Sequence, residues 1–225
     1  MDPIAALAAA SIALVGTHFA LSHPLRASLV KPLGPTGFMV AYSLVAAACM
    51  VWMALAFRAA PPADLSGATG DGGWLLATLL TLPALVLFLG SFRGNPALPA
   101  PGAERAATQA PQGVFHVTRH PMMWGFALWA VSHLVLWWSW RTVIVASAVL
   151  VLALVGAHFQ DRKKAALMGA AWADWQAQTS YWPRWGKLPG AGVALWLAAL
   201  ATWLLLSWLH LPSAGVPAGI WRWIG

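Results

Sequence analysis

Two histidines lie inside long apolar stretches of this chain: His18 near the N-terminus, and His133 between Met122 and Trp140. An ionisable side chain at such a depth in a bilayer is costly, so it usually faces the interior of a helix bundle and has a function there. Imidazole in such a dry site commonly binds a metal or haem iron, or relays protons. If both stretches are helices, each histidine shares a face with mostly apolar residues. These residues are Leu7, Ser11, Leu14 and Val15 for the first stretch, and Met122, Phe126, Trp129, Leu136 and Trp140 for the second.

Two imidazoles on facing helices, between apolar walls, are what a six-coordinate b-type haem requires in a membrane bundle. We therefore predict that His18 and His133 bind the iron of haem b and take part in its chemistry. The alternative is that both only hydrogen-bond to helix carbonyls. Counted from the helix ends, the two histidines differ in depth by about 10 Å. This difference keeps His23 and His120 as alternative ligands.

A basic motif stands at the start of the apolar stretch that contains His133. Arg119 and His120 precede Pro121, and proline in the first turn of a helix costs no backbone hydrogen bond. Arg119 and Arg26 both stand where a helix leaves the membrane, so we expect them to neutralise haem propionates, with His120 in the same cofactor site. The single cysteine, Cys49, excludes an intramolecular disulfide and covalent haem attachment through Cys-x-x-Cys-His.

The composition indicates an integral membrane protein. Of the 225 residues 60% are hydrophobic and only 8% are charged, which is outside the range of soluble domains. Sixteen tryptophans stand against two tyrosines, and tryptophan favours the membrane–water interface. The net charge of +7 comes without the interleaved aromatic and basic residues of RNA-binding proteins, so we expect lipid partners and no nucleic acid. We predict a single membrane domain over residues 1–225.

Six apolar runs reach the roughly 17–25 residues that a transmembrane helix needs. They are Pro3–Ser22, Gly37–Phe57, Gly73–Phe92, Met122–Trp140, Thr142–Phe159 and Ala191–Leu211. The loops after the first, third and fifth runs hold ten of the thirteen Lys and Arg residues. The positive-inside rule puts these loops in the cytoplasm and both termini outside. The predicted fold is an all-α, multi-pass bundle of about six transmembrane helices.

One cytoplasmic segment, residues 161–180, has an apolar stripe at helical spacing. Met168, Ala171, Trp172 and Trp175 recur opposite polar positions, after a basic start. This pattern predicts an interfacial helix lying on the cytoplasmic membrane surface. The alternative is a solvated cytoplasmic hairpin.

Three segments together resemble the NnrU family. Residues 113–133 read GVFHVTRHPMMWGFALWAVSH, residues 17–26 read THFALSHPLR, and residues 178–183 read QTSYWP. The matches fall at both ends and in the middle, so the resemblance covers nearly the whole chain. NnrU proteins are bacterial membrane proteins associated with nitrite and nitric oxide reduction. They are homologous to plant 15-cis-zeta-carotene isomerase, which holds haem b between two histidines.

The resemblance implies a haem-dependent protein of the bacterial inner membrane. The two isomerase ligands match His18 and His133, while His120 matches a family motif without being the expected ligand. One implied function is cis–trans isomerisation of a hydrophobic polyene, as in carotenoid biosynthesis. A second is electron transfer or nitric oxide sensing linked to denitrification. A third is an accessory factor in which the histidines are structural.

The Arg-His-Pro-x-x-x-Gly pattern from Arg119 to Gly125 also resembles membrane methyltransferases that bind S-adenosylmethionine. Those enzymes typically have a Glu-Glu pair before a cytoplasmic aromatic segment. The corresponding place here reads Asp161-Arg162-Lys163-Lys164, with Asp161 as its only acid. We therefore expect no methyltransferase activity.

Overall fold

The computed structural model describes residues 1–65, 67, 69–98 and 102–224, and this part of the chain contains helices and no strand. Six of the helices are long and apolar. They are α1 (Pro3–Ser22), α2 (Arg26–Ala59), α3 (Gly70–Gly90), α5 (Pro121–Leu136), α6 (Trp140–Met168) and α8 (Val193–Trp208). The shorter elements are α4 (Ala103–Ala107), η1 (Gly113–His116), α7 (Ala170–Gln178), η2 (Trp185–Ala191), α9 (His210–Ala214) and α10 (Trp221–Ile224). The predicted all-α membrane fold is confirmed.

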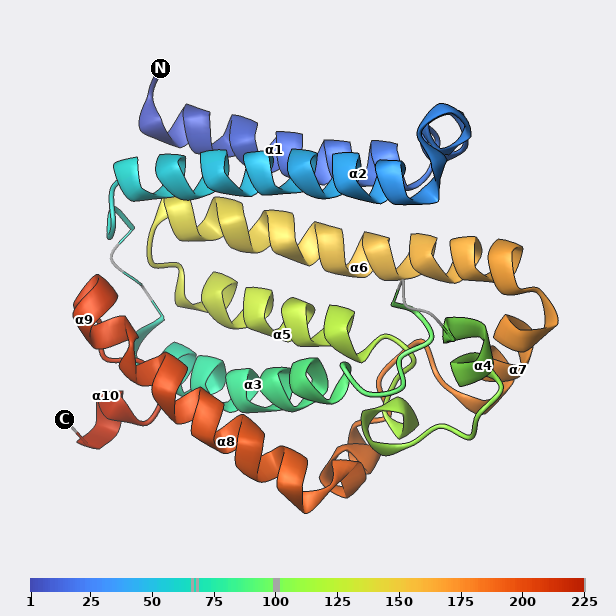
Figure 1. Cartoon of the computed structure of the whole chain (residues 1–225). Coiled ribbons are helices and arrows are strands. Elements are labelled where there is room, and N and C mark those ends of the chain that lie inside the picture. The colour runs from blue at the N-terminus through green and yellow to red at the C-terminus, as the bar shows by residue number, and fades with distance from the viewer. Residues whose placement is uncertain (66, 68, 99–101, 225) are drawn as a thin grey trace.

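The long helices form layers, with α6 between two groups (Figure 1). On one side α6 packs against α1, which in turn pairs with α2. On the other side α6 packs against α5, which pairs with α3, and α8 packs against α3. Both chain termini lie at the same end of the bundle, which we call the terminal end. The opposite end, with residues 23–26, 91–98, 102–120 and 160–191, is the basic end.

Five segments of the described chain are long and apolar enough to cross a membrane, and α5 is a sixth, shorter apolar helix. The sixteen residues of α5 extend about 24 Å, slightly less than the hydrocarbon core of a bilayer, about 30 Å thick. Large apolar side chains are exposed along the outer helices, for example Leu44, Trp52 and Leu55 on α2. The protein is thus a multi-pass membrane protein whose outer helices contact lipid.

The hairpin between α5 and α6 differs from the prediction. The fourth run was expected to continue to Trp140, with Arg141 alone before the next helix. Instead, α5 ends at Leu136 and Trp137 adopts a left-handed conformation with φ of 47°. Ser139 then caps α6, because its side chain accepts a hydrogen bond from the Thr142 N–H. The hydropathy of the sequence did not predict this turn, because the turn contains tryptophans and is as apolar as the helices beside it.

The basic end also differs, because no single surface helix covers residues 161–180. Here α6 continues past the apolar run to Met168, and α7 begins only at Ala170 after a turn at Gly169. Trp172 and Trp175 are fully buried within the protein, in a core cluster with Val114, Phe115 and other residues. The interfacial helix was therefore a wrong prediction, because its apolar stripe packs on protein and not on lipid.

Candidate functional site

His133 lies near the terminal end, four residues before the turn that closes α5. Its Nδ1 is 2.8 Å from the carbonyl oxygen of Trp129, and because a carbonyl only accepts, Nδ1 carries the proton. In the neutral imidazole the other nitrogen, Nε2, is then an unprotonated electron-pair donor. The Trp129 ring lies against the imidazole, with 4.3 Å between ring centres. The bond from Nδ1 to the Trp129 carbonyl is the hydrogen bond to a helix carbonyl that the alternative interpretation of His133 describes. The same bond also fixes the tautomer that metal-binding histidines use.

His210 is the histidine closest to His133. It begins α9, and the two ring centres are 6.5 Å apart, with 34° between the ring planes. Its Nδ1 lies 2.8 Å from the carbonyl oxygen of Leu206, so the same argument leaves its Nε2 unprotonated. His210 was not among the ligands predicted from the sequence. Its position carried a signal, however, because the fourth and sixth runs cross the bundle in the same direction and end on the same side.

His18 lies at the basic end of α1, among residues from α2 and α6. The Tyr42 hydroxyl is 2.7 Å from its ring nitrogens. His23 and Lys163 are close enough to interact with it electrostatically. Arg26 lies over the Phe38 ring at 5.4 Å and interacts electrostatically with Lys163. His18 therefore belongs to a polar and basic group between α1, α2 and α6.

The structure does not bring His18 and His133 together. α6 lies between their helices (Figure 1). Phe19, next to His18, contacts Phe159 with 5.6 Å between ring centres, whereas His133 lies beside the first turns of α6.

One iron holds two imidazole nitrogens about 4 Å apart, since each metal–nitrogen bond is about 2 Å long. The order of the helices, with α6 between α1 and α5, does not bring the two imidazoles to this spacing. His23 and His120 lie at the basic end as well, so neither replaces His18 as the partner of His133. Arg26 and Arg119 are also at that end, far from a cofactor bound to His133.

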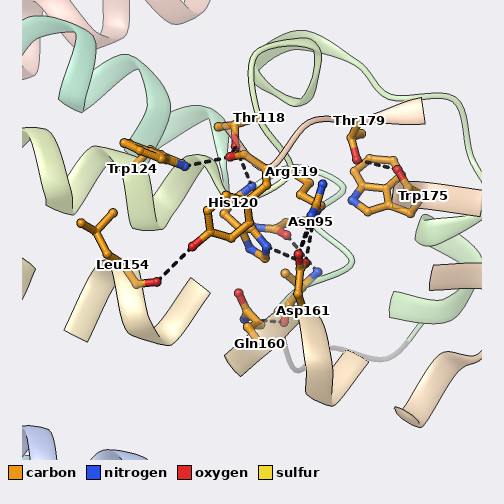
Figure 2. A network of polar contacts seen from close by, with 12 residues as sticks. Asn95, Thr118, Arg119, His120, Trp124, Leu154, Gln160, Asp161, Trp175 and Thr179 are labelled. Atoms are coloured by element: carbon orange, nitrogen blue, oxygen red, sulfur yellow. Dashed lines mark hydrogen bonds and ion pairs between the residues drawn. The ribbon is translucent and has the colours of Figure 1, made fainter. Parts of the chain in front are cut away.

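Arg119, His120 and Asp161 form a compact ion-pair cluster at the basic end (Figure 2). Arg119 Nε donates to Asp161 Oδ1 over 2.9 Å, and its Nη2 forms a further ion pair with Oδ2. His120 Nε2 lies 2.7 Å from Asp161 Oδ1 and donates to it. The His120 side chain is completely buried, and its Nδ1 has no hydrogen-bond partner among the residues that the structure describes.

Backbone contacts tie this cluster to the segment after α7 (Figure 2). The Thr118 hydroxyl and Trp124 Nε1 both donate to the carbonyl oxygen of Tyr181, at 2.8 and 3.0 Å. The Tyr181 hydroxyl donates to the Leu154 carbonyl, and the side chain packs against Arg119 and His120. Burial raises the pKa of Tyr181, and the nearby Asp161 carboxylate raises it further. The cluster thus joins the start of α5, the far part of α6 and residues 180–181.

Glycine at position 125 serves helix packing. A Cβ atom there would come within 2.8 Å of the Ala84 carbonyl oxygen of α3. Gly125 thus allows α3 to approach α5 closely. In the methyltransferase pattern the same motif would contact S-adenosylmethionine. Here Arg119 and His120 are both engaged by Asp161.

Within the described residues no group of three or more His, Cys, Asp or Glu side chains is placed to hold a metal ion. A cofactor with its own metal, bound by one or two histidines, needs no such group. Comparison with known proteins adds one finding at the level of family. No curated protein and no solved structure matches the chain. The family model described as NnrU protein matches residues 6–218, which is nearly the whole chain, and the protein therefore belongs to the NnrU family.

Proposed function

We propose that this NnrU-family protein binds haem b through His133 and acts on a hydrophobic substrate that reaches the site from the lipid. The observation that carries the proposal is the state of the His133 ring. Its Nδ1–H is fixed by the Trp129 carbonyl, which leaves Nε2 as an electron-pair donor inside a membrane helix. Histidines that bind metals usually have this second hydrogen bond, because it sets the tautomer and the ring orientation.

The surroundings of His133 support a hydrophobic substrate. Phe126 and Trp129, on the same helix, are partly exposed on the outer surface of the bundle. A lipid-soluble molecule can therefore approach along α5 without crossing water. Haem would supply one-electron redox chemistry at this place, while the aromatic side chains hold the substrate and exclude water.

The family resemblance favours cis–trans isomerisation of a polyene. This reaction neither adds atoms to the substrate nor removes any. The second candidate is electron transfer or nitric oxide sensing, and the accessory role without chemistry is the third. A catalytic test separates the first function from the others. The protein should convert 9,15,9′-tri-cis-zeta-carotene to the 9,9′-di-cis isomer in cells that accumulate the former.

The conversion should be lost in His133→Ala and retained in His158→Ala, because His158 is an exposed residue of α6. Haem-loaded protein that produces no di-cis isomer would exclude the isomerase function and favour electron transfer or gas sensing. Conversion that is unchanged in His133→Ala would remove His133 from the proposed site.

A further inference from the structure

The two histidines at the terminal end have a spacing that suits a shared metal. A metal–imidazole bond is about 2 Å long and each ring nitrogen lies about 1.2 Å from the ring centre, so a metal between two opposed imidazoles separates their centres by about 6.4 Å. The ring centres of His133 and His210 are 6.5 Å apart. The angle between the two ring planes is 34°.

The hydrogen bonds of the two residues are also matched. Each imidazole donates its Nδ1–H to the carbonyl oxygen of the residue four positions earlier, Trp129 for His133 and Leu206 for His210. Each is thereby held as the tautomer that presents Nε2 to a ligand. No hydrogen-bond partner is present for either Nε2 among the described residues.

The pair is reachable from the membrane. Trp137, four residues after His133, is partly exposed, and so are Leu206 and Leu209 beside His210. A planar apolar cofactor can therefore reach the imidazoles from the lipid side. His210 is also only partly buried, so its ring has room to turn toward a ligand.

We infer that His210 is the second histidine that would hold the metal centre at His133. This inference rests on the proposed function, since it concerns the same haem. It assigns His18, His23 and Arg26 no contact with that cofactor. Both ligands then come from the terminal end, His133 from α5 and His210 from α9, so the cofactor lies away from the Arg119–Asp161 cluster.

The test is the spin state of the ferric haem in the purified full-length protein, measured by electron paramagnetic resonance and optical absorption. Wild-type protein should be low-spin, with two imidazole ligands. His210→Ala should become high-spin and five-coordinate, and added imidazole should restore the low-spin spectrum. His18→Ala is the matched control, because it removes a membrane histidine at the other end, and it should stay low-spin.

Two results overturn the inference while leaving the proposed function in place. One is a low-spin spectrum in His210→Ala with haem still bound, and the other is a high-spin spectrum in His18→Ala. If wild-type protein binds no haem, the proposed function itself fails.

The pairing of the two rings has a readout that needs no haem. Cu²⁺ favours imidazole ligands, and on haem-free protein its paramagnetic spectrum should show two coordinated nitrogens. Either single variant, His133→Gln or His210→Gln, should show one nitrogen and bind Cu²⁺ about tenfold or more weakly. Wild-type and variant proteins with identical copper spectra would show that the two imidazoles do not share a metal.

Discussion

Arg119 and Asp161 are joined through two carboxylate oxygens, and this pair connects the start of α5 to the far part of α6 across 42 positions of sequence. Both side chains are 12% exposed, and His120 shares the same carboxylate. The mostly buried Asp161 carboxylate binds both Arg119 and His120, and it therefore holds these parts of the basic end together. Its loss would leave a guanidinium without a counter-ion.

Asp161→Asn should therefore destabilise the protein strongly. Removing one partner of a buried ion pair costs about 3–5 kcal/mol, because the remaining charge stays desolvated. The free energy of unfolding in detergent, measured by reversible denaturant titration, checks this value. Asp174→Asn is the matched control, since Asp174 is exposed on α7, and should change stability by about 0.5 kcal/mol or less. Equal effects of the two substitutions would contradict a structural role for the cluster.

Trp172→Ala tests whether α7 belongs to the protein core. The Trp172 side chain is completely buried, and replacing a buried tryptophan by alanine typically costs about 3–5 kcal/mol. Trp182→Ala serves as the control, because Trp182 is 68% exposed. Thermal unfolding followed by circular dichroism should separate the two variants clearly. A small effect of Trp172→Ala on thermal stability, together with binding of α7 to lipid vesicles, would contradict this packing. It would indicate that α7 lies on the membrane surface.

His23 should titrate below the ordinary histidine value of about 6.5. Burial lowers its pKa, and the nearby positive charge of Lys163 lowers it further. The folded state then takes up the proton less readily than the unfolded state, so stability is full above about pH 6.5 and decreases as the pH falls below it. Nuclear magnetic resonance of labelled histidines measures this pKa directly.

Lys163→Gln should raise the pKa of His23 toward its ordinary value, since one of the two causes is removed. The same spectra of wild-type protein provide the reference for this comparison. A His23 pKa at or above 6.5 in the native protein would show that the environment of residues 18–26 is not the one described.

The orientation of the bundle follows from its charge distribution. A reporter fused after Lys187 should give a cytoplasmic signal, and one fused near the C-terminus should give an external signal, because ten of thirteen basic residues lie at one end. A cytoplasmic signal from both fusions would contradict the predicted span between them and the external C-terminus.

The long helices were predictable because bilayer length and hydropathy act on every residue of a span. α1 has the predicted bounds, Pro3–Ser22. The helix ends were harder, since they depend on single conformations. The left-handed Trp137 ends α5 early, and Gly34, with φ of 69°, interrupts α2 between Pro32 and Pro35.

Contacts between helices that are far apart in the sequence could not be predicted either. Depth in the membrane selected His133 and His18, but depth along a helix does not show which helices are neighbours. The order of layers, with α6 between α1 and α5, separates these two residues. The partners of Asp161 were equally hidden, because Arg119 and His120 are more than 40 positions away in the sequence.

The most direct test of the account is the absorption spectrum of protein purified from haem-replete cells. The account predicts a Soret band, with sharp α and β bands on reduction. In His133→Ala the haem should be lost or become five-coordinate, while the exposed-site variant His158→Ala should keep the wild-type spectrum. A colourless protein that takes up no added hemin would contradict the central claim, and so would a spectrum that is unchanged in His133→Ala.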